Sequence, residues 1–193
     1  MEDIKLLDRV KSMVDKLLGE RSDVLDHWRR QRLTTSGRVK NFENWILVEL
    51  VHQLWNSGIV KQIRTNGTVE GRSYTGNPLS SGRKAQSGSL SPDLAIRTTK
   101  DFILDIEIKT QVSPQSVIND IIIVKNHNEK EAKSNYRACF LWIVVAPCDS
   151  TLEKRVWKSV EGIKAKVNRE LRVNIEEYKI KPWLHYYIAA PFM

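Results

Sequence analysis

The stretch LSPDLAIRTTKDFILDIEIKTQ, residues 90–111, decides the fold because it holds two apolar segments separated by a short polar turn. Each segment predicts a strand, and the turn TTKD between them predicts a hairpin. Charged residues nevertheless stand in these segments or at their ends, among them Asp93, Glu107 and Lys109. A charge in a buried strand is costly unless it is paired or binds a metal, so these charges need a physical reason.

The second segment, FILDIEIKT, alternates between apolar and charged residues with the period of a strand. One face of that strand is apolar and is expected to pack on a helix, while the other face is charged. The apolar members are Leu104, Ile106 and Ile108, and the charged members are Asp105, Glu107 and Lys109. Because Asp93 opens the neighbouring strand, its carboxylate and that of Glu107 could share a hard divalent cation, which prefers oxygen ligands.

The motif resembles the signature of the PD-(D/E)XK nuclease superfamily, in which a Pro-Asp pair precedes a strand containing an acid, any residue and a lysine. The matching residues are Pro92 and Asp93, followed by Glu107, Ile108 and Lys109. Other acid-x-Lys triplets occur, but Pro92-Asp93 is the only Pro-Asp pair in the chain. Taken alone, Glu107 and Lys109 are also compatible with an ordinary ion pair at a strand end.

The resemblance implies a role for each residue of the motif. Asp93 and Glu107, with the backbone carbonyl of Ile108, would bind Mg²⁺, for which Mn²⁺ is the expected substitute. Lys109 would orient or deprotonate the attacking water, because desolvation beside a metal lowers the pKa of a lysine. Hydrolysis of a phosphodiester would then leave a 5′-phosphate and a 3′-hydroxyl.

Members of the superfamily often add a glutamate from the first core helix to the metal site. Glu43 is the expected residue, because it stands near the start of a predicted helix and is followed by apolar residues, and Glu49 is the alternative. Gln111 lies one alternation beyond Lys109 and is expected to position water or phosphate. Asp105 is either a further accessory group or a solvated strand end.

Hydrophobic periodicity predicts the other elements. Helices are expected over residues 4–17, 22–32, 42–57, 114–134 and 151–171, and strands over residues 59–65, 93–97, 102–110, 139–147 and 185–191. The superfamily core runs helix, three strands, helix, strand, and residues 41–147 follow that order. The expected fold class is therefore α/β, a restriction-endonuclease-like mixed sheet flanked by helices. We expect one compact domain overall, in which residues 1–37 form an N-terminal helical extension and residues 38–193 form the nuclease domain that the resemblance implies.

The chain of 193 residues is basic, with 31 Lys and Arg against 23 Asp and Glu, and this balance favours polyanionic partners. Two stretches are expected to contact DNA: the glycine-rich region around residues 67–90 and the run HWRRQR. The contacting residues are Arg64, Arg72, Arg83 and Lys84 in or beside the first stretch, and Arg29 and Arg30 in the second. A stretch as long as the first is either functional or disordered, and HWRRQR is by default a solvated face.

Two cysteines are too few for a disulfide framework, and the longest apolar run, ACFLWIVVAP, is too short to span a bilayer. The expected location is the cytoplasm, with no membrane contact.

Within the superfamily the chain is most similar to the small type II restriction endonucleases, so we expect Mg²⁺-dependent, sequence-specific cleavage of DNA, with no small-molecule substrate. A homodimer is expected, with its interface on helix 151–171 or the N-terminal helix. A structure-selective repair or recombination nuclease of the junction-resolving type, a viral RNA endonuclease and a non-catalytic nucleic-acid-binding module remain alternatives.

Overall fold

The hairpin expected around the turn TTKD is present in the computed structural model, which describes residues 2–30, 42–65, 92–110, 112–132 and 135–191. Strand β2 (Leu94–Thr98) pairs antiparallel with β3 (Ile103–Lys109), and Leu94 lies opposite Ile106. In the turn, Asp101 adopts a left-handed backbone with φ of 58°, a conformation that aspartate tolerates better than most residues. Its carboxylate accepts hydrogen bonds from Lys61 and Arg97, which connect the turn to the adjacent strand Val60–Thr65 and to β2.

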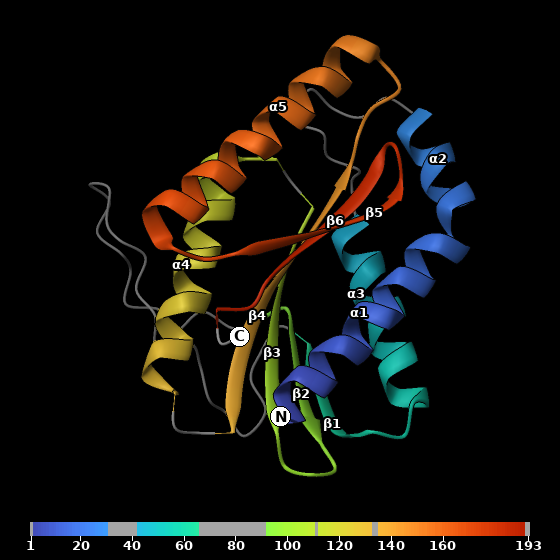
Figure 1. The fold of residues 1–193 in the computed structure, drawn as a ribbon. Coiled ribbons are helices and arrows are strands. Elements are labelled where there is room, and N and C mark those ends of the chain that lie inside the picture. Colours follow the sequence, from blue (N-terminus) through green and yellow to red (C-terminus); the bar gives the residue numbers. More distant parts are fainter. Residues whose placement is uncertain (1, 31–41, 66–91, 111, 133–134, 192–193) are drawn as a thin grey trace.

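Six strands form one mixed sheet in the order β1-β2-β3-β4-β6-β5 (Figure 1). The four strands outside the hairpin are β1 (Val60–Thr65), β4 (Tyr136–Val145), β5 (Ile175–Lys181) and β6 (Leu184–Ala189). Strands β3 and β4 are parallel, while every other neighbouring pair is antiparallel. The parallel pair requires a crossover, which helix α4 (Pro114–Lys130) supplies.

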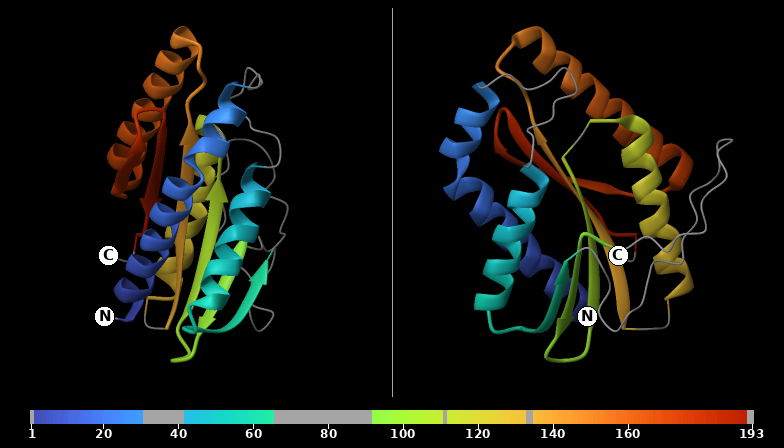
Figure 2. Two further views of the ribbon diagram at one scale, coloured as in Figure 1. Left: turned by 90° about the vertical axis from the view of Figure 1, so that its right-hand side faces the viewer. Right: turned by 180° about the vertical axis from the view of Figure 1, so that it is seen from behind.

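Helices cover both faces of this sheet (Figure 2). One face packs on α1 (Glu2–Glu20), α2 (Ser22–Arg30) and α3 (Phe42–Asn56). The other face packs on α4 and on α5 (Ser150–Lys166), which continues into a π-helical turn at Val167–Leu171. Successive residues of β4 alternate between the two cores, so this central strand is apolar on both sides.

The predicted α/β class and the mixed sheet flanked by helices are confirmed. Each predicted helix and strand is present, with ends that differ by a few residues. Strand β5 was not predicted, and it makes the outer hairpin with β6. The stretch 67–90 lies outside the described residues.

Helix α1, which belongs to the expected N-terminal extension, contributes fully buried side chains to the same core as α3. These are Leu7, Val14 and Leu18 of α1, together with Ile46 and Leu50 of α3. The apolar stripe of α1 is therefore used within the chain. No helix in the described ranges is long and apolar enough to cross a membrane.

Candidate active site

The hairpin register brings Asp93 and Glu107 to the same level of the sheet. Asp93 immediately precedes β2, and because Leu94 lies opposite Ile106, Asp93 falls beside Glu107. The Oδ2 atom of Asp93 accepts a hydrogen bond of 2.7 Å from the backbone N–H of Ile108. This bond continues the ladder by one step and fixes the Asp93 carboxylate at the end of β3. The two acids of the motif are therefore brought together, as the alternation predicted.

Helix α3 adds Glu43 to this group from the other face of the sheet. Glu43 is in the first turn of α3, and its Oε2 atom accepts a hydrogen bond of 3.3 Å from the hydroxyl of Thr110, which directly follows β3. Glu49 lies six residues along the same helix and so points about 120° away from Glu43. Among the described residues, no contact links Glu49 to the site. The structure thus favours Glu43 as the helix carboxylate.

A fourth carboxylate, Asp120 of α4, was not predicted. Its Oδ2 atom lies 3.0 Å from the Lys109 ammonium, and only 15% of the Lys109 side chain and 16% of the Asp120 side chain are exposed. The partner of Lys109 is therefore Asp120 rather than the neighbouring Glu107 of the simple ion-pair interpretation. The sequence holds one signal for it, an isolated acid just before the apolar run IIIV in the helix that follows the motif.

Negative charge exceeds positive charge in this site, since four carboxylates surround one ammonium. Burial, together with the charges of Asp93, Asp120 and Glu43, raises the pKa of Glu107 to about 9. Burial also raises the pKa of Asp93 to about 6, although the N–H of Ile108 opposes this, and burial raises the pKa of Asp120. An isolated carboxylate cluster of this kind favours the binding of protons or of a cation.

The pKa of Lys109 is set by burial and by the acids around it. Burial acts to lower this pKa, but the ion pair with Asp120 and the charges of Glu43 and Glu107 outweigh it, so the pKa of Lys109 is raised. The lowered pKa that we expect for Lys109 applies beside a bound metal and stays a prediction, and the charge of Asp120 opposes it. In this arrangement Lys109 is a hydrogen-bond donor and a positive charge.

The donor set fits a hard divalent cation. Among the described residues, no group of three or more His, Cys, Asp and Glu side chains is placed to hold a metal ion. The set that the motif implies needs only the two carboxylates of Asp93 and Glu107 and the carbonyl oxygen of Ile108. Oxygen ligands of this type, with waters completing the shell, match the preference of Mg²⁺. Cation binding would also offset the repulsion that raises the pKa of Glu107.

Asp105 lies away from this group, in the core beneath α4. It is fully buried, and the hydroxyl of Tyr136 donates a hydrogen bond to its Oδ2 atom. Within the described part of the chain, its Oδ1 atom has no hydrogen-bond partner, and burial raises the pKa of Asp105 to about 7. The interpretation as a solvated strand end is therefore wrong, because α4 covers this half of β3.

The basic residues expected to contact DNA are placed differently from one another. Arg64 is exposed on the edge strand β1 and lies opposite Ala95. Arg29 and Arg30 both pair with Asp26, and the Arg29 guanidinium also stacks over the ring of Trp183 at 4.4 Å. Arg29 thus has a packing role, whereas the side chain of Arg30 is 67% exposed. The remaining residues of this prediction, Arg72, Arg83, Lys84 and the accessory Gln111, lie outside the described residues.

Comparison of the chain with models of protein families, with curated proteins and with solved structures gave no match. The functional assignment therefore depends on the residues and geometry of the site.

Proposed function

We propose that this protein is a Mg²⁺-dependent endonuclease that hydrolyses DNA phosphodiester bonds on a restriction-endonuclease-like fold. The observation that supports it most is the convergence of Glu43, Asp93 and Glu107 around Lys109 at one end of β3. The element order from α3 to β4 also agrees with the helix, three strands, helix, strand core of the PD-(D/E)XK superfamily, which the motif resembles.

Each residue has a distinct task in this proposal. A bound Mg²⁺ would polarise the scissile phosphate and lower the pKa of a coordinated water. Asp93 is held in place by the Ile108 N–H, so its second oxygen is free to face the cation. Lys109 donates hydrogen bonds to the attacking water or to a phosphate oxygen, where its positive charge stabilises the charge that develops in the transition state. Asp120 restricts where the Lys109 ammonium lies.

Placement of the chain around the site supports a nucleic-acid substrate. Thr65 pairs with Leu94, the residue after Asp93, so β1 ends beside the carboxylates and the chain returns to the same place at Pro92. The segment between them, residues 66–91, is rich in Gly and Ser and contains Arg72, Arg83 and Lys84 with Glu70 as its one acid. Ser, Arg and Lys are types that contact phosphates and base edges. We propose that this segment recognises the DNA sequence, as in a type II restriction endonuclease of the cytoplasm.

Homodimer formation belongs to the same proposal, because cutting both strands requires two sites. The apolar stripe of α1 is already covered within the chain. Val48 and Trp55 are exposed by 66% and 61%, and they lie two turns apart on the outer side of α3. We place the dimer contact on this side of α3, because it would bury both of these exposed side chains. The contact would then lie on the same helix that carries Glu43.

The decisive experiment is digestion of plasmid DNA, branched DNA and single-stranded RNA with Mg²⁺ or Mn²⁺. Discrete plasmid fragments that disappear in EDTA are expected. Glu43→Gln should impair cleavage, while Glu49→Gln, the same substitution on the same helix, should not. Loss of cleavage is also expected for Glu107→Gln. Cleavage of branched DNA alone would favour a junction-resolving nuclease, and an intact panel under all conditions would refute nuclease activity.

A further inference from the structure

Helix α5 carries its basic residues in two different arrangements. In its first half, Lys154, Arg155 and Lys158 are exposed, and none has an ion-pair partner within the part of the chain that the structure describes. The cations of the second half and of the following turn all have acidic partners. These pairs are Lys164 with Glu161 and Glu177, and both Lys166 and Arg169 with Glu170.

Helix stability does not explain the unpaired group. Lys154 and Lys158 are four residues apart and Arg155 and Lys158 are three apart, so the like charges are neighbours on the helix surface. Like-charge neighbours at these spacings destabilise a helix. A helix face that only contacts water is more stable with oppositely charged pairs, such as those in the second half of α5. Glu153 and Glu161 are nearby, but they contact Trp157 and Lys164 instead. Three adjacent cations that have no ion pair in the described structure therefore suit a polyanionic partner better than they suit the isolated fold.

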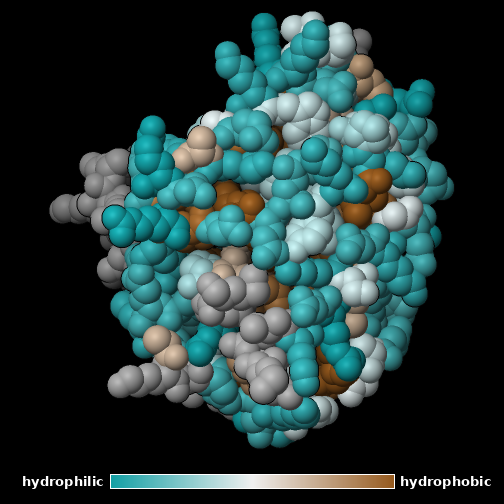
Figure 3. Space-filling view, viewed as in Figure 1, coloured by the Kyte–Doolittle hydropathy of each residue, from teal (hydrophilic) through white to brown (hydrophobic). Residues whose placement is uncertain are grey.

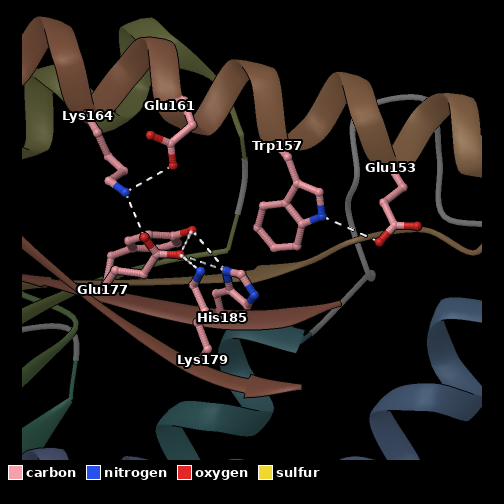
Figure 4. A network of polar contacts seen from close by, with 8 residues as sticks. Glu153, Trp157, Glu161, Lys164, Glu177, Lys179 and His185 are labelled. Carbon is pink, nitrogen blue, oxygen red and sulfur yellow. Dashed lines mark hydrogen bonds and ion pairs between the residues drawn. The ribbon is translucent and has the colours of Figure 1, made fainter. Parts of the chain in front are cut away.

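Contacts on the inner side of α5 fix which of its residues point outward. Trp157 stacks on His185 with ring centroids 4.3 Å apart, and Lys164 forms an ion pair of 2.7 Å with Glu177 (Figure 4). The side chain of Asp149 caps the start of the helix by accepting hydrogen bonds from two backbone N–H groups. The helix cannot rotate without breaking these contacts. Its basic face is therefore presented in one orientation.

Strand register places this half of α5 at the same end of the sheet as the carboxylate group. Lys109 pairs with Trp142 of β4, and His185 pairs with Val144, two residues further along β4. Because Trp157 stacks on His185, the first half of α5 lies at and beyond the level of Lys109. Figure 3 shows hydrophilic side chains projecting from this upper end of the molecule, where Figure 1 places the start of α5.

We propose that Lys154, Arg155 and Lys158 form a surface that binds the phosphate backbone of duplex DNA next to the cleavage site. This inference rests on the proposed nuclease function and adds a binding surface to it. It also places the dimer contact elsewhere, because in a symmetric interface on this face the three cations of one subunit would oppose those of the other.

The test compares two triple variants that lose the same charge at opposite ends of the sheet. The first is Lys154→Gln, Arg155→Gln and Lys158→Gln. The matched control is Lys5→Gln, Arg9→Gln and Lys100→Gln, whose residues line a cavity of about 220 Å³ beside the hairpin turn. Binding of a fluorescently labelled DNA duplex is measured by anisotropy over a salt series, with Ca²⁺ in place of Mg²⁺. Circular dichroism verifies that both variants are folded.

The α5 variant is expected to bind DNA at least about tenfold more weakly, with a plot of log K against log salt shallower by about 2.7, which corresponds to three lost phosphate contacts. The control should bind nearly as well as the wild-type protein. Equal weakening in both variants would mean that only net charge matters and would overturn the proposal. Unchanged binding by the α5 variant would overturn it while leaving the nuclease function intact. A wild-type protein that binds no duplex at all would overturn both.

Discussion

The charge imbalance at Glu107 predicts an unusual dependence of stability on pH. The pKa of this carboxyl is raised from 4.5 to about 9, so in EDTA the folded protein retains a proton that the unfolded chain has lost between these values. The free energy of unfolding should therefore decrease as pH rises, by about 1.4 kcal/mol per pH unit for one such group. From pH 5 to pH 8 this amounts to about 4 kcal/mol at most, because water entering the open edge of the site reduces the effect.

Glu107→Gln removes this titration and retains the shape of the side chain. Urea unfolding in EDTA should give similar stabilities for variant and wild type at pH 5, and a variant more stable by about 2–4 kcal/mol at pH 8. Mg²⁺ should stabilise the wild type at pH 8, by about 2.7 kcal/mol at a hundred times its dissociation constant, and the variant much less. Glu49→Gln is the control and should follow the wild type. Parallel pH curves for wild type and Glu107→Gln, or equal stabilisation of both by Mg²⁺, would refute the reasoning.

Three further outcomes are expected. Asp120→Asn removes the partner of Lys109 and should slow single-turnover DNA cleavage by about 10–100-fold without changing the thermal midpoint greatly; a normal rate would show that Lys109 needs no positioning. Asp105→Asn can still accept the Tyr136 hydrogen bond. Because the pKa of Asp105 is raised to about 7, the wild type should lose stability between about pH 4 and pH 7, and the variant should not. Identical pH dependence of urea unfolding for the two proteins in that range would contradict a buried Asp105 carboxyl. Leu7→Ala should destabilise the whole protein by about 3 kcal/mol in a single transition, whereas a separate transition would show that α1 folds independently of the sheet.

The alternation of apolar and charged residues was sufficient to predict the hairpin and the strand face that carries the acids. Alternation along β3 assigned Ile106 and Ile108 to an apolar face that packs on a helix, and both are fully buried in the core that β3 shares with α3. The choice of Glu43 over Glu49 followed from helical position, and the hydrogen bond from Thr110 agrees with it. These features depend on neighbours within a few residues or within one hairpin, where sequence spacing translates directly into geometry.

Features that depend on distant partners could not be predicted in the same way. Strand β5 has the sequence IEEYKIK, in which the charges hide the alternation. Its charges are satisfied by two helices, since Lys11 of α1 pairs with Glu176 and Lys164 of α5 pairs with Glu177. Likewise, the raised pKa of Lys109 depends on an acid eleven residues away that meets it only because α4 folds back along β3.

The hydrogen bond from the Ile108 N–H to Asp93 forms only if β2 and β3 pair in one register. The length of the hairpin turn, at the far end of these strands, therefore controls the geometry of the site. The turn at residues 98–101 sets how far β2 has slid along β3 when the chain arrives at Asp93. One residue more or less in that turn would shift the pairing by a step, and since side chains alternate, Asp93 would then point to the face opposite Glu107. Turn length, rather than any residue of the site itself, thus decides whether the carboxylates of Asp93 and Glu107 lie on the same face of the sheet.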